Sequence, residues 1–300
     1  MVSGGSTLFG LALGFPAAFA MAWHRMTWPA TATLFARMAP GTLFLLPWLV
    51  MFTEVGLTGT RTVLVLTPYA SAALLDREFA WDRAIAEGAV APGCALIAAA
   101  DILLPGPGEL VADSRIDDEV VPAKVMAEGA AALKLLVIWR PDGNPEARIA
   151  LVDDFVARCR AAGMVSIVEP VCRKPRDGRA WDTAEGILPA AQELGGRGAD
   201  IYKAEMPLFG NGPEAVVRRA CAELTRIVNG PWVVLSSGVT PDAFPQAVEW
   251  ACREGASGFL AGRAVWRTVI GHPDMEAALQ KDAVVRLQRL CDVVDKTVGG

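Results

Sequence analysis

Residues 200–207 read Asp-Ile-Tyr-Lys-Ala-Glu-Met-Pro and are followed at once by Leu-Phe-Gly-Asn-Gly. The period of two in a β-strand places Ile201, Lys203 and Glu205 on one face and the remaining, mostly apolar side chains on the other. Pro207 and the glycines beyond it end the strand. The segment therefore predicts a short buried strand with a lysine at its centre.

A lysine inside a short apolar strand is costly to bury, so its charge must be paired or lost. Desolvation lowers the pKa of a lysine, and a lysine with a lowered pKa is a nucleophile toward carbonyl groups. We interpret Lys203 as the Schiff-base lysine of an aldolase. The alternative for this residue alone is a solvated lysine on an edge strand.

The composition narrows the classes of protein that remain. The 300 residues are 53% hydrophobic and can bury a large core, and the net charge of −5 gives no reason to expect nucleic acid as a partner. Six scattered cysteines without a CxxC pair suit a reducing compartment, so we expect a cytoplasmic protein. Two histidines make a His-rich zinc site or a Ser-His-Asp triad improbable.

Short apolar segments alternate with amphipathic helical patterns from Thr67 onward. The predicted strands are Ser71–Asp76, Cys94–Ala99, Ala131–Trp139, Val165–Val171, Asp200–Pro207, Trp232–Gly238 and Gly258–Gly262. The predicted helices are Glu146–Ala162, Trp181–Leu194, Gly212–Val228, Asp242–Glu254 and Asp274–Val298, and residues 104–108 read as a Pro/Gly loop. Near-continuous apolar strands that alternate with helices indicate a parallel sheet covered on both faces.

Polar residues recur on these strands at an even spacing. Lys134, Glu169 and Lys203 follow one another at about one βα unit each, and Ser237 lies one unit further on. At least seven such units fit an α/β fold of the (β/α)8 TIM-barrel type, within one domain over residues 67–300. An open doubly wound sheet is the alternative, but no G-x-G-x-x-G motif opens the first clear unit.

Residues 1–66 differ from the rest of the chain in composition, and we expect them to form an atypical first βα unit. They hold one acidic residue, Glu54, and three arginines among apolar runs. A signal peptide or membrane anchor is the alternative for this segment, and it would make the protein fractionate with membranes. No basic residue precedes the first run, Pro16 interrupts that run, and the second run is broken by Pro47 and too short to span a bilayer. We therefore expect no membrane association.

Lys134, Glu169 and Lys203 are the predicted catalytic residues, because barrel enzymes carry such residues near the carboxyl ends of different strands. If the three face the lumen, Lys134 is a second cation that depresses the pKa of Lys203. Glu169 can then carry protons as an imine forms and hydrolyses. The alternative is a buried Lys–Glu–Lys network without chemistry.

The last two predicted strands carry candidate anion-binding residues: Ser237, Gly238, Gly262 and Arg263. Loops after the seventh and eighth strands of many barrels bind phosphate through backbone N–H groups and a basic residue. Two weaker candidates for substrate contact are Arg173, in the basic loop after Glu169, and Asp76, which otherwise caps a helix.

These segments also resemble a known family. Residues 134–140 (KLLVIWR), 165–170 (VSIVEP), 202–208 (YKAEMPL), 232–239 (WVVLSSGV) and 255–266 (GASGFLAGRAVW) resemble class I aldolases of the tagatose-1,6-bisphosphate aldolase group. Within that group they are most similar to sulfofructosephosphate aldolases. The resemblance runs from about Thr67 to the C-terminus.

The resemblance implies a (β/α)8 barrel and a metal-independent retro-aldol reaction without a cofactor. The implied substrate is a small-molecule ketose phosphate, 6-deoxy-6-sulfofructose 1-phosphate, cleaved to dihydroxyacetone phosphate and 3-sulfolactaldehyde in sulfoquinovose breakdown. Tagatose 1,6-bisphosphate, which gives glyceraldehyde 3-phosphate instead, is the alternative substrate, and a sugar-phosphate-binding pseudoenzyme is the alternative class. We also expect a homo-oligomer.

The chain departs from this family at its first strand. The family's first strand ends in an Asp-Gln-Arg-type motif, whereas here a strand-like start at Phe19-Ala20-Met21 continues without any Asp or Gln. We hypothesise that residues 22–66 do not encode the family's first βα unit, as a shifted reading frame would produce. Resequencing this part of the gene tests the hypothesis, which fails if no alternative frame encodes the motif.

Overall fold

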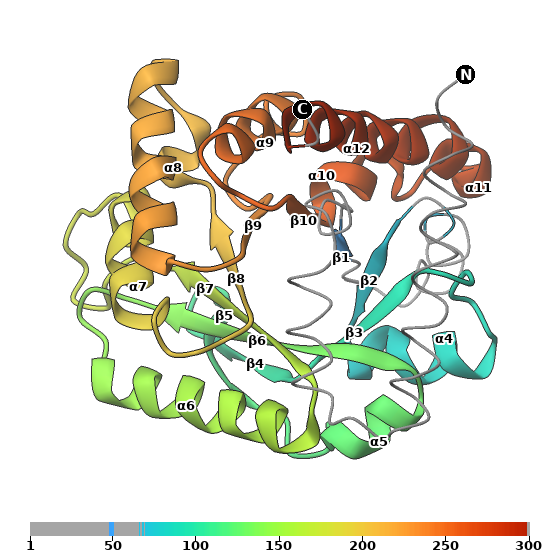
Figure 1. Cartoon of the computed structure of the whole chain (residues 1–300), viewed down its shortest axis with the longest axis horizontal. Coiled ribbons are helices and arrows are strands. Elements are labelled where there is room, and N and C mark those ends of the chain that lie inside the picture. The colour runs from blue at the N-terminus through green and yellow to red at the C-terminus, as the bar shows by residue number, and fades with distance from the viewer. Residues whose placement is uncertain (1–47, 51–65, 67, 69, 299–300) are drawn as a thin grey trace, which may run out of the picture. The chain divides into compact units, whose positions relative to one another are not determined.

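Eight strands close into a barrel in the computed structural model of the chain, which describes residues 48–50, 66, 68 and 70–298 (Figure 1). Their order around the barrel is β1-β10-β9-β8-β7-β6-β3-β2, and all neighbouring pairs are parallel. The strands are β1 (Trp48–Val50), β2 (Ala72–Leu75), β3 (Ala95–Ala99), β6 (Ala130–Trp139), β7 (Val165–Cys172), β8 (Ile201–Glu205), β9 (Trp232–Leu235) and β10 (Phe259–Ala261). The predicted (β/α)8 barrel is confirmed.

Helices cover the outside of this barrel. The longer ones are α6 (Pro145–Ala162), α7 (Ile187–Leu194), α8 (Glu214–Val228), α9 (Phe244–Arg253) and α12 (Val284–Val298). Shorter turns and helices are η3 (Arg77–Trp81), α4 (Asp82–Ala86), α5 (Pro122–Ala127), η4 (Thr183–Gly186), η5 (Pro207–Gly210), α10 (Arg263–Trp266), η6 (Arg267–Val269), α11 (Met275–Ala278) and η7 (Leu279–Ala283). These elements include all five helices predicted from periodicity.

Local sequence signals explain where helix α6 begins and ends. The Asn144 side chain accepts hydrogen bonds from the Glu146 and Ala147 amides, and Pro145 occupies the first turn, where no intrahelical N–H is needed. Gly163 ends the helix at φ 69°, a left-handed conformation that glycine adopts at little cost. The pattern of cap, proline and glycine therefore sets the length of the connection between β6 and β7.

The alternation of side chains along each strand separates two cores. Outward-facing residues of the strands pack under the helices, as Tyr202, Ala204 and Met206 do around β8. Inward-facing residues fill the lower lumen in a second cluster made of Ala72, Leu74, Ile97, Ala99, Ala132, Ile167, Val233 and Leu260. Lys203 lies on the inward face with Ile201, so polar residues on this face are held above a closed apolar floor.

An antiparallel hairpin interrupts the βα alternation between β3 and β6. It consists of β4 (Asp101–Gly106) and β5 (Glu109–Ile116), so residues 104–108, expected to be a loop, are the end of β4 and the turn that leads into β5. The hairpin packs on β6, where the Ser114 hydroxyl donates to the Leu136 carbonyl at 2.6 Å. It therefore stands at the carboxyl-terminal mouth of the barrel.

Strand β1 closes the barrel between β10 and β2, with Trp48 in register with Leu260 on one side and Ala72 on the other. This strand falls within the segment that composition set apart as atypical. Of residues 1–66, the structure describes only β1 and Leu66. The strand-like start at residues 19–21 and most of the segment to which the reading-frame hypothesis applies therefore lie outside the described residues. The apolar runs considered as a possible membrane anchor also lie mainly outside them.

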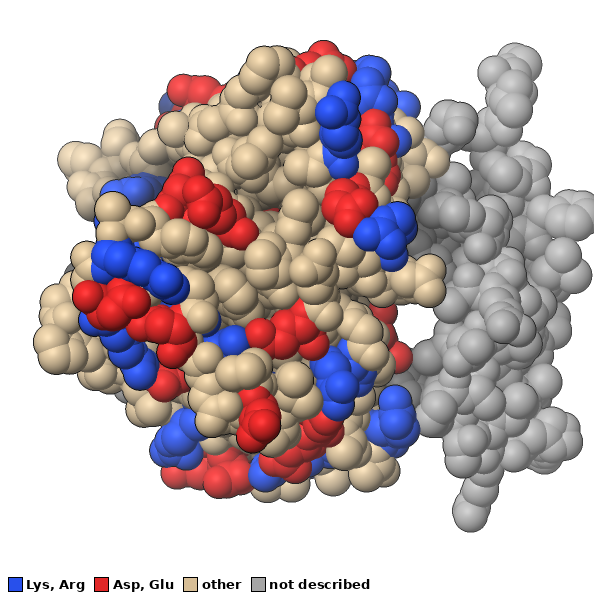
Figure 2. All heavy atoms as spheres, turned by 90° about the vertical axis from the view of Figure 1, so that its left-hand side faces the viewer, with Lys and Arg blue, Asp and Glu red and all other residues tan. Residues whose placement is uncertain are grey.

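The surface shown in Figure 2 mixes acidic and basic side chains without a large area of one sign. Many of these charges form ion pairs, such as Arg158 with Asp154 on α6 and Arg226 with Glu223 on α8. In the part of the chain that the structure describes, no helix is both long enough and apolar enough to cross a bilayer.

Candidate active site

Four buried charged side chains form one continuous chain of contacts inside the barrel. The Lys203 Nζ atom lies 2.8 Å from Glu169 Oε1, and the Lys134 Nζ atom lies 3.6 Å from Glu169 Oε2. Lys134 also donates to both carboxylate oxygens of Asp101, at 2.7 and 3.0 Å. Each of the four side chains is at most 2% exposed. The predicted residues Lys134, Glu169 and Lys203 are thus brought together, and Asp101 joins them.

Strand register places these side chains on the inner face. Lys134 of β6 stands opposite Ala99 of β3 and Ile167 of β7, both of which belong to the apolar floor of the lumen. Glu169 lies two residues beyond Ile167 and therefore points to the same side, one layer higher. The polar side chains therefore form a layer in the lumen next to the apolar cluster, on its carboxyl-terminal side.

The pKa of Lys203 is lowered to about 8, chiefly because burial disfavours its charged form. The carboxylate of Glu169 opposes that shift, and the positive charge of Lys134 adds to it. Burial also lowers the pKa of Lys134, but the negative charges of Asp101 and Glu169 outweigh that effect and raise its pKa. The two lysines therefore differ: Lys134 stays an ammonium ion while Lys203 readily becomes a neutral amine.

One oxygen of Glu169 is available for a further hydrogen bond. The Oε2 atom is buried and makes no hydrogen bond to any described residue, although Lys134 lies within ion-pair distance of it. Buried polar atoms without a partner are uncommon and call for an explanation such as a catalytic role. A hydroxyl group or water brought beside Lys203 would satisfy this oxygen.

A cavity of about 390 Å³ opens above this ion chain. Its volume lies in the range typical of sites for small molecules. Its lining consists of Asp76, Leu103, Glu109, Leu110, Val111, Leu136, Glu169, Val171, Arg173, Lys203, Leu235, Ser236, Ser237, Leu260, Gly262 and Arg263. Because most of the barrel residues in this lining lie in the carboxyl-terminal part of a strand or in the loop after it, the cavity occupies the face where barrel enzymes bind substrates.

Seven of the nine residues predicted from sequence line this cavity, and two do not. Lys134 lies beneath it, fully buried. Gly238 is exposed and has φ 76°, and a Cβ atom added there would clash with the Phe209 ring. The absence of a side chain at Gly238 therefore accommodates Phe209, a role that the sequence motif did not suggest.

Three acidic residues at the site were missed from the sequence. Asp101 lies two residues beyond the predicted strand Cys94–Ala99, and Asp76 is the last residue of the predicted strand before it, so a carboxylate near a strand end was the available signal. Glu205 lies two residues beyond Lys203; it accepts from the Cys172 amide at 2.8 Å and from the Ser237 hydroxyl. Glu109 begins β5 of the unexpected hairpin, so no strand signal pointed to it.

Glu205 is an interior carboxylate that connects two strand ends. Burial raises its pKa, while hydrogen bonds from Cys172 and Ser237 and the nearby charge of Arg173 act in the opposite direction. It therefore holds the end of β7 and the Ser237 loop in a fixed relation. Within the described residues, no group of three or more His, Cys, Asp or Glu side chains is placed to share a metal ion.

The comparison with protein families matches residues 61–268 to the model described as "DeoC/LacD family aldolase". The chain belongs to the DeoC/LacD aldolase family. This membership agrees with the lyase class predicted from Lys203 and its neighbours.

Curated relatives include tagatose 1,6-diphosphate aldolases. The protein of that name from Listeria monocytogenes (strain HCC23) is 28% identical over 232 residues, which cover 67% of this chain and 66% of the relative. One from Streptococcus pyogenes (strain SSI-1) is 26% identical over 228 residues, with coverages of 67% and 68%. The match thus spans just under two thirds of the length of the Listeria relative.

Solved structures support the fold. An archaeal fructose-1,6-bisphosphate aldolase superposes with a TM-score of 0.57 at 16% identity, over 87% of this chain and 97% of that chain. Fructose-bisphosphate aldolase from Plasmodium falciparum gives 0.61 at 14% identity, over 87% and 94%. At these identities the likeness concerns the barrel architecture.

Proposed function

We propose that the protein is a class I aldolase that forms an imine between Lys203 and the ketone of a ketose 1-phosphate. The observation that carries this proposal is the buried Lys203 amine, held 2.8 Å from Glu169 and open to the cavity. With a pKa of about 8, roughly a quarter of this lysine is neutral at pH 7.5, against about 0.1% for an ordinary lysine. Only the neutral amine attacks a carbonyl carbon.

The ion chain supports each proton transfer that the reaction needs. The neutral Nζ of Lys203 attacks the ketone carbon, and the resulting carbinolamine loses its hydroxyl as water after a proton is delivered to it. Glu169 is within hydrogen-bond distance of Nζ and has a second oxygen free to accept, so it can carry these protons. Lys134 is paired with Asp101, which raises its pKa and keeps it protonated, so it does not compete as the nucleophile.

The iminium ion then serves as the electron sink for carbon–carbon cleavage. The C4 hydroxyl loses its proton, the C3–C4 bond breaks toward the iminium, and the aldehyde departs, leaving an enamine on Lys203. Protonation at C3 and hydrolysis of the imine release dihydroxyacetone phosphate and return the free lysine. The archaeal fructose-1,6-bisphosphate aldolase noted above is described with its catalytic lysine covalently bound to the carbinolamine intermediate, which supports a lysine carbinolamine as the first intermediate proposed here.

We assign the phosphate of the dihydroxyacetone half to the side of the cavity formed by Ser236, Ser237, Gly262 and Arg263. These residues follow β9 and β10, offer two hydroxyl groups, and include a guanidinium group suited to bidentate phosphate binding. Asp76 and Arg173 line other parts of the cavity and remain candidates for contact with the aldehyde half.

The proposed substrate is 6-deoxy-6-sulfofructose 1-phosphate, cleaved to dihydroxyacetone phosphate and 3-sulfolactaldehyde, as the resemblance of the segments around Lys203 implies. Tagatose 1,6-bisphosphate is the second candidate, and it is favoured by the Listeria and Streptococcus relatives, which are named for that substrate. A cytoplasmic location, a homo-oligomeric assembly and independence from metals and cofactors remain predictions.

Borohydride trapping with dihydroxyacetone phosphate tests the imine. Reduction converts the imine to a stable amine, so peptide mass spectrometry should find the adduct on the peptide that contains Lys203. Lys203→Met should abolish both the adduct and cleavage, whereas Lys124→Met, which removes an exposed lysine, should change neither. A folded protein without an adduct, or Lys203→Met with undiminished turnover, would overturn the proposal, and ligand binding without an adduct would favour the pseudoenzyme.

A further inference from the structure

The hairpin β4–β5 forms a wall of the cavity opposite the proposed phosphate site. It packs on β6, and β6 is four strands away from β10 in the closed order of eight, so the two stand across the barrel from each other. We call this side the distal wall and define it by its cavity-lining residues Leu103, Glu109, Leu110, Val111 and Arg173. A ketose phosphate with its phosphate near Arg263 directs its other end toward this wall.

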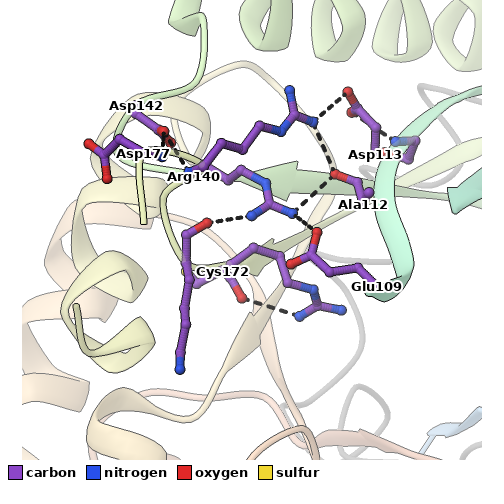
Figure 3. A network of polar contacts seen from close by, with 11 residues as sticks. Glu109, Ala112, Asp113, Arg140, Asp142, Cys172 and Asp177 are labelled. Atoms are coloured by element: carbon purple, nitrogen blue, oxygen red, sulfur yellow. Dashed lines mark hydrogen bonds and ion pairs between the residues drawn. The ribbon is translucent and has the colours of Figure 1, made fainter. Parts of the chain in front are cut away.

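Arg140 fixes the distal wall in position (Figure 3). Its guanidinium group is almost fully buried and bonds to the Glu109 carboxylate, to the Lys174 carbonyl, and to the Ala112 carbonyl at 3.3 Å. One arginine thus joins the hairpin, the end of β6 and the loop after β7. Because Glu109 is the partner that lines the cavity, its carboxylate is presented to the substrate with a defined orientation.

The distal wall presents one acidic and one basic group to the cavity. Glu109 is paired with Arg140, but of these two only Glu109 lines the cavity, so its negative charge lies nearer the substrate. The basic group is the guanidinium of Arg173, which donates to its neighbour's carbonyl, Cys172 O, at 3.2 Å. Arg176 does not line the cavity and pairs with Asp113 on the outside of the hairpin at 3.5 Å. The other charged groups that face the cavity or lie just beneath the wall are Asp76, Glu169, Lys203, Glu205 and Arg263.

The two candidate substrates differ in charge at the end that reaches this wall. A sulfonate carries one negative charge throughout the range in which proteins are stable. A phosphate monoester carries about −1.5 to −2 at pH 7, because its second pKa is about 6. A fixed carboxylate beside a single arginine therefore suits a monoanion and repels the second charge of a phosphate.

From this arrangement we infer that Glu109 is a specificity-determining residue that restricts the distal group of the substrate to a single negative charge. This inference rests on the proposed function and adds the charge class of the aldehyde half. Glu109 acts by repulsion, and Arg173 supplies the attraction. Removing the carboxylate while keeping the side-chain volume should admit a dianion.

The test compares cleavage of 6-deoxy-6-sulfofructose 1-phosphate and tagatose 1,6-bisphosphate by the wild type and by Glu109→Gln. The kcat/KM for the sulfonate divided by the kcat/KM for the bisphosphate should fall by about 10-fold to 100-fold in the variant, because kcat/KM for the bisphosphate rises. Where cleavage of one compound is undetectable, its inhibition constant against the other substrate replaces kcat/KM. Asp113→Asn is the matched control, since it removes one carboxylate from the same hairpin at a position outside the cavity.

The pH dependence separates repulsion from a merely loosened hairpin. In the wild type, KM for the bisphosphate should rise relative to that for the sulfonate between about pH 5.5 and 8, as the distal phosphate loses its second proton. The 1-phosphate is common to both substrates and cancels in the ratio. Glu109→Gln should flatten this relative rise.

Each outcome decides the inference. The inference is overturned if Glu109→Gln lowers kcat/KM equally for both substrates or leaves the ratio of the two kcat/KM values unchanged. It is also overturned if the wild type prefers the bisphosphate. Failure of the proposed function looks different, because then neither compound is cleaved and no Lys203 adduct forms.

Discussion

Replacing Glu169 by Gln changes two properties of Lys203 in opposite directions. The substitution keeps the side-chain volume but removes the negative charge that Lys203 contacts at 2.8 Å. That charge favours the protonated lysine, so its loss makes the amine easier to deprotonate. The same change removes the group proposed to carry protons to and from the carbinolamine.

The expected shift follows from the geometry of the contact. A hydrogen bond between charged groups contributes about 1.5–3 kcal/mol, which corresponds to about 1–2 pKa units. The acid limb of kcat/KM, near pH 8 in the wild type, should therefore move to about pH 6–7 in Glu169→Gln. Over the same range kcat should fall by about 10²-fold to 10⁴-fold, because general acid–base catalysis is lost.

The assay is a pH–rate profile of dihydroxyacetone phosphate release from about pH 5.5 to 9.5, measured on both forms with the same substrate. Ionisation of the substrate phosphate is then common to both profiles. Glu223→Gln, which alters an exposed carboxylate on α8, should leave the profile unchanged. An acid limb that stays in place or moves to higher pH would refute the assignment of that limb to Lys203 beside Glu169.

Three further substitutions test the frame of the site. Asp101→Asn should lower the free energy of unfolding by about 3–5 kcal/mol in urea titrations, because it leaves the buried charge of Lys134 without its closest carboxylate; an unchanged midpoint would contradict this. Gly238→Ala should cost about 1–3 kcal/mol through its clash with Phe209, and Phe209→Ala in the same chain should recover part of the loss. Glu205→Gln should raise KM for the phosphorylated substrate about tenfold with a smaller change in kcat, since the Ser237 loop loses its charged acceptor; steady-state kinetics that show the reverse pattern would argue against this role.

The sequence predicted seven of the eight barrel strands, because each is a near-continuous apolar run that ends in a polar or glycine-containing turn. Strand β1 has three residues inside a longer apolar run, and its place in the barrel depends on pairing with β2 and β10 rather than on local pattern. The hairpin was not predicted because Pro105 to Gly108 reads as a loop and because β5 (ELVADSRI) has neither a regular polar/apolar alternation nor a long apolar run.

The residues of the candidate site that could be predicted from the sequence are those that recur with the spacing of the strands. Lys134, Glu169 and Lys203 recur at one βα unit, so a barrel brings them together whatever the details of their loops. Asp101 and Glu109 depend on the hairpin, and their contacts with Lys134 and Arg140 follow from tertiary packing that no periodicity reports. A phosphate-binding backbone at Gly238 remains a prediction, and the left-handed conformation and the nearby Phe209 ring give a separate reason for glycine at this position.

The first residue of the hairpin, Asp101, limits which part of the hairpin could be exchanged between aldolases. Asp101 is the first residue of β4, pairs across the hairpin with Ile116, and also binds the ammonium group of Lys134. A graft that replaced the whole hairpin would therefore alter the charges around Lys134 and Glu169, next to Lys203, as well as the wall of the cavity. An exchange designed to test substrate choice would therefore replace residues 102–115, keep an acid at position 109 as the partner of buried Arg140, and leave Asp101 in place beside Lys134.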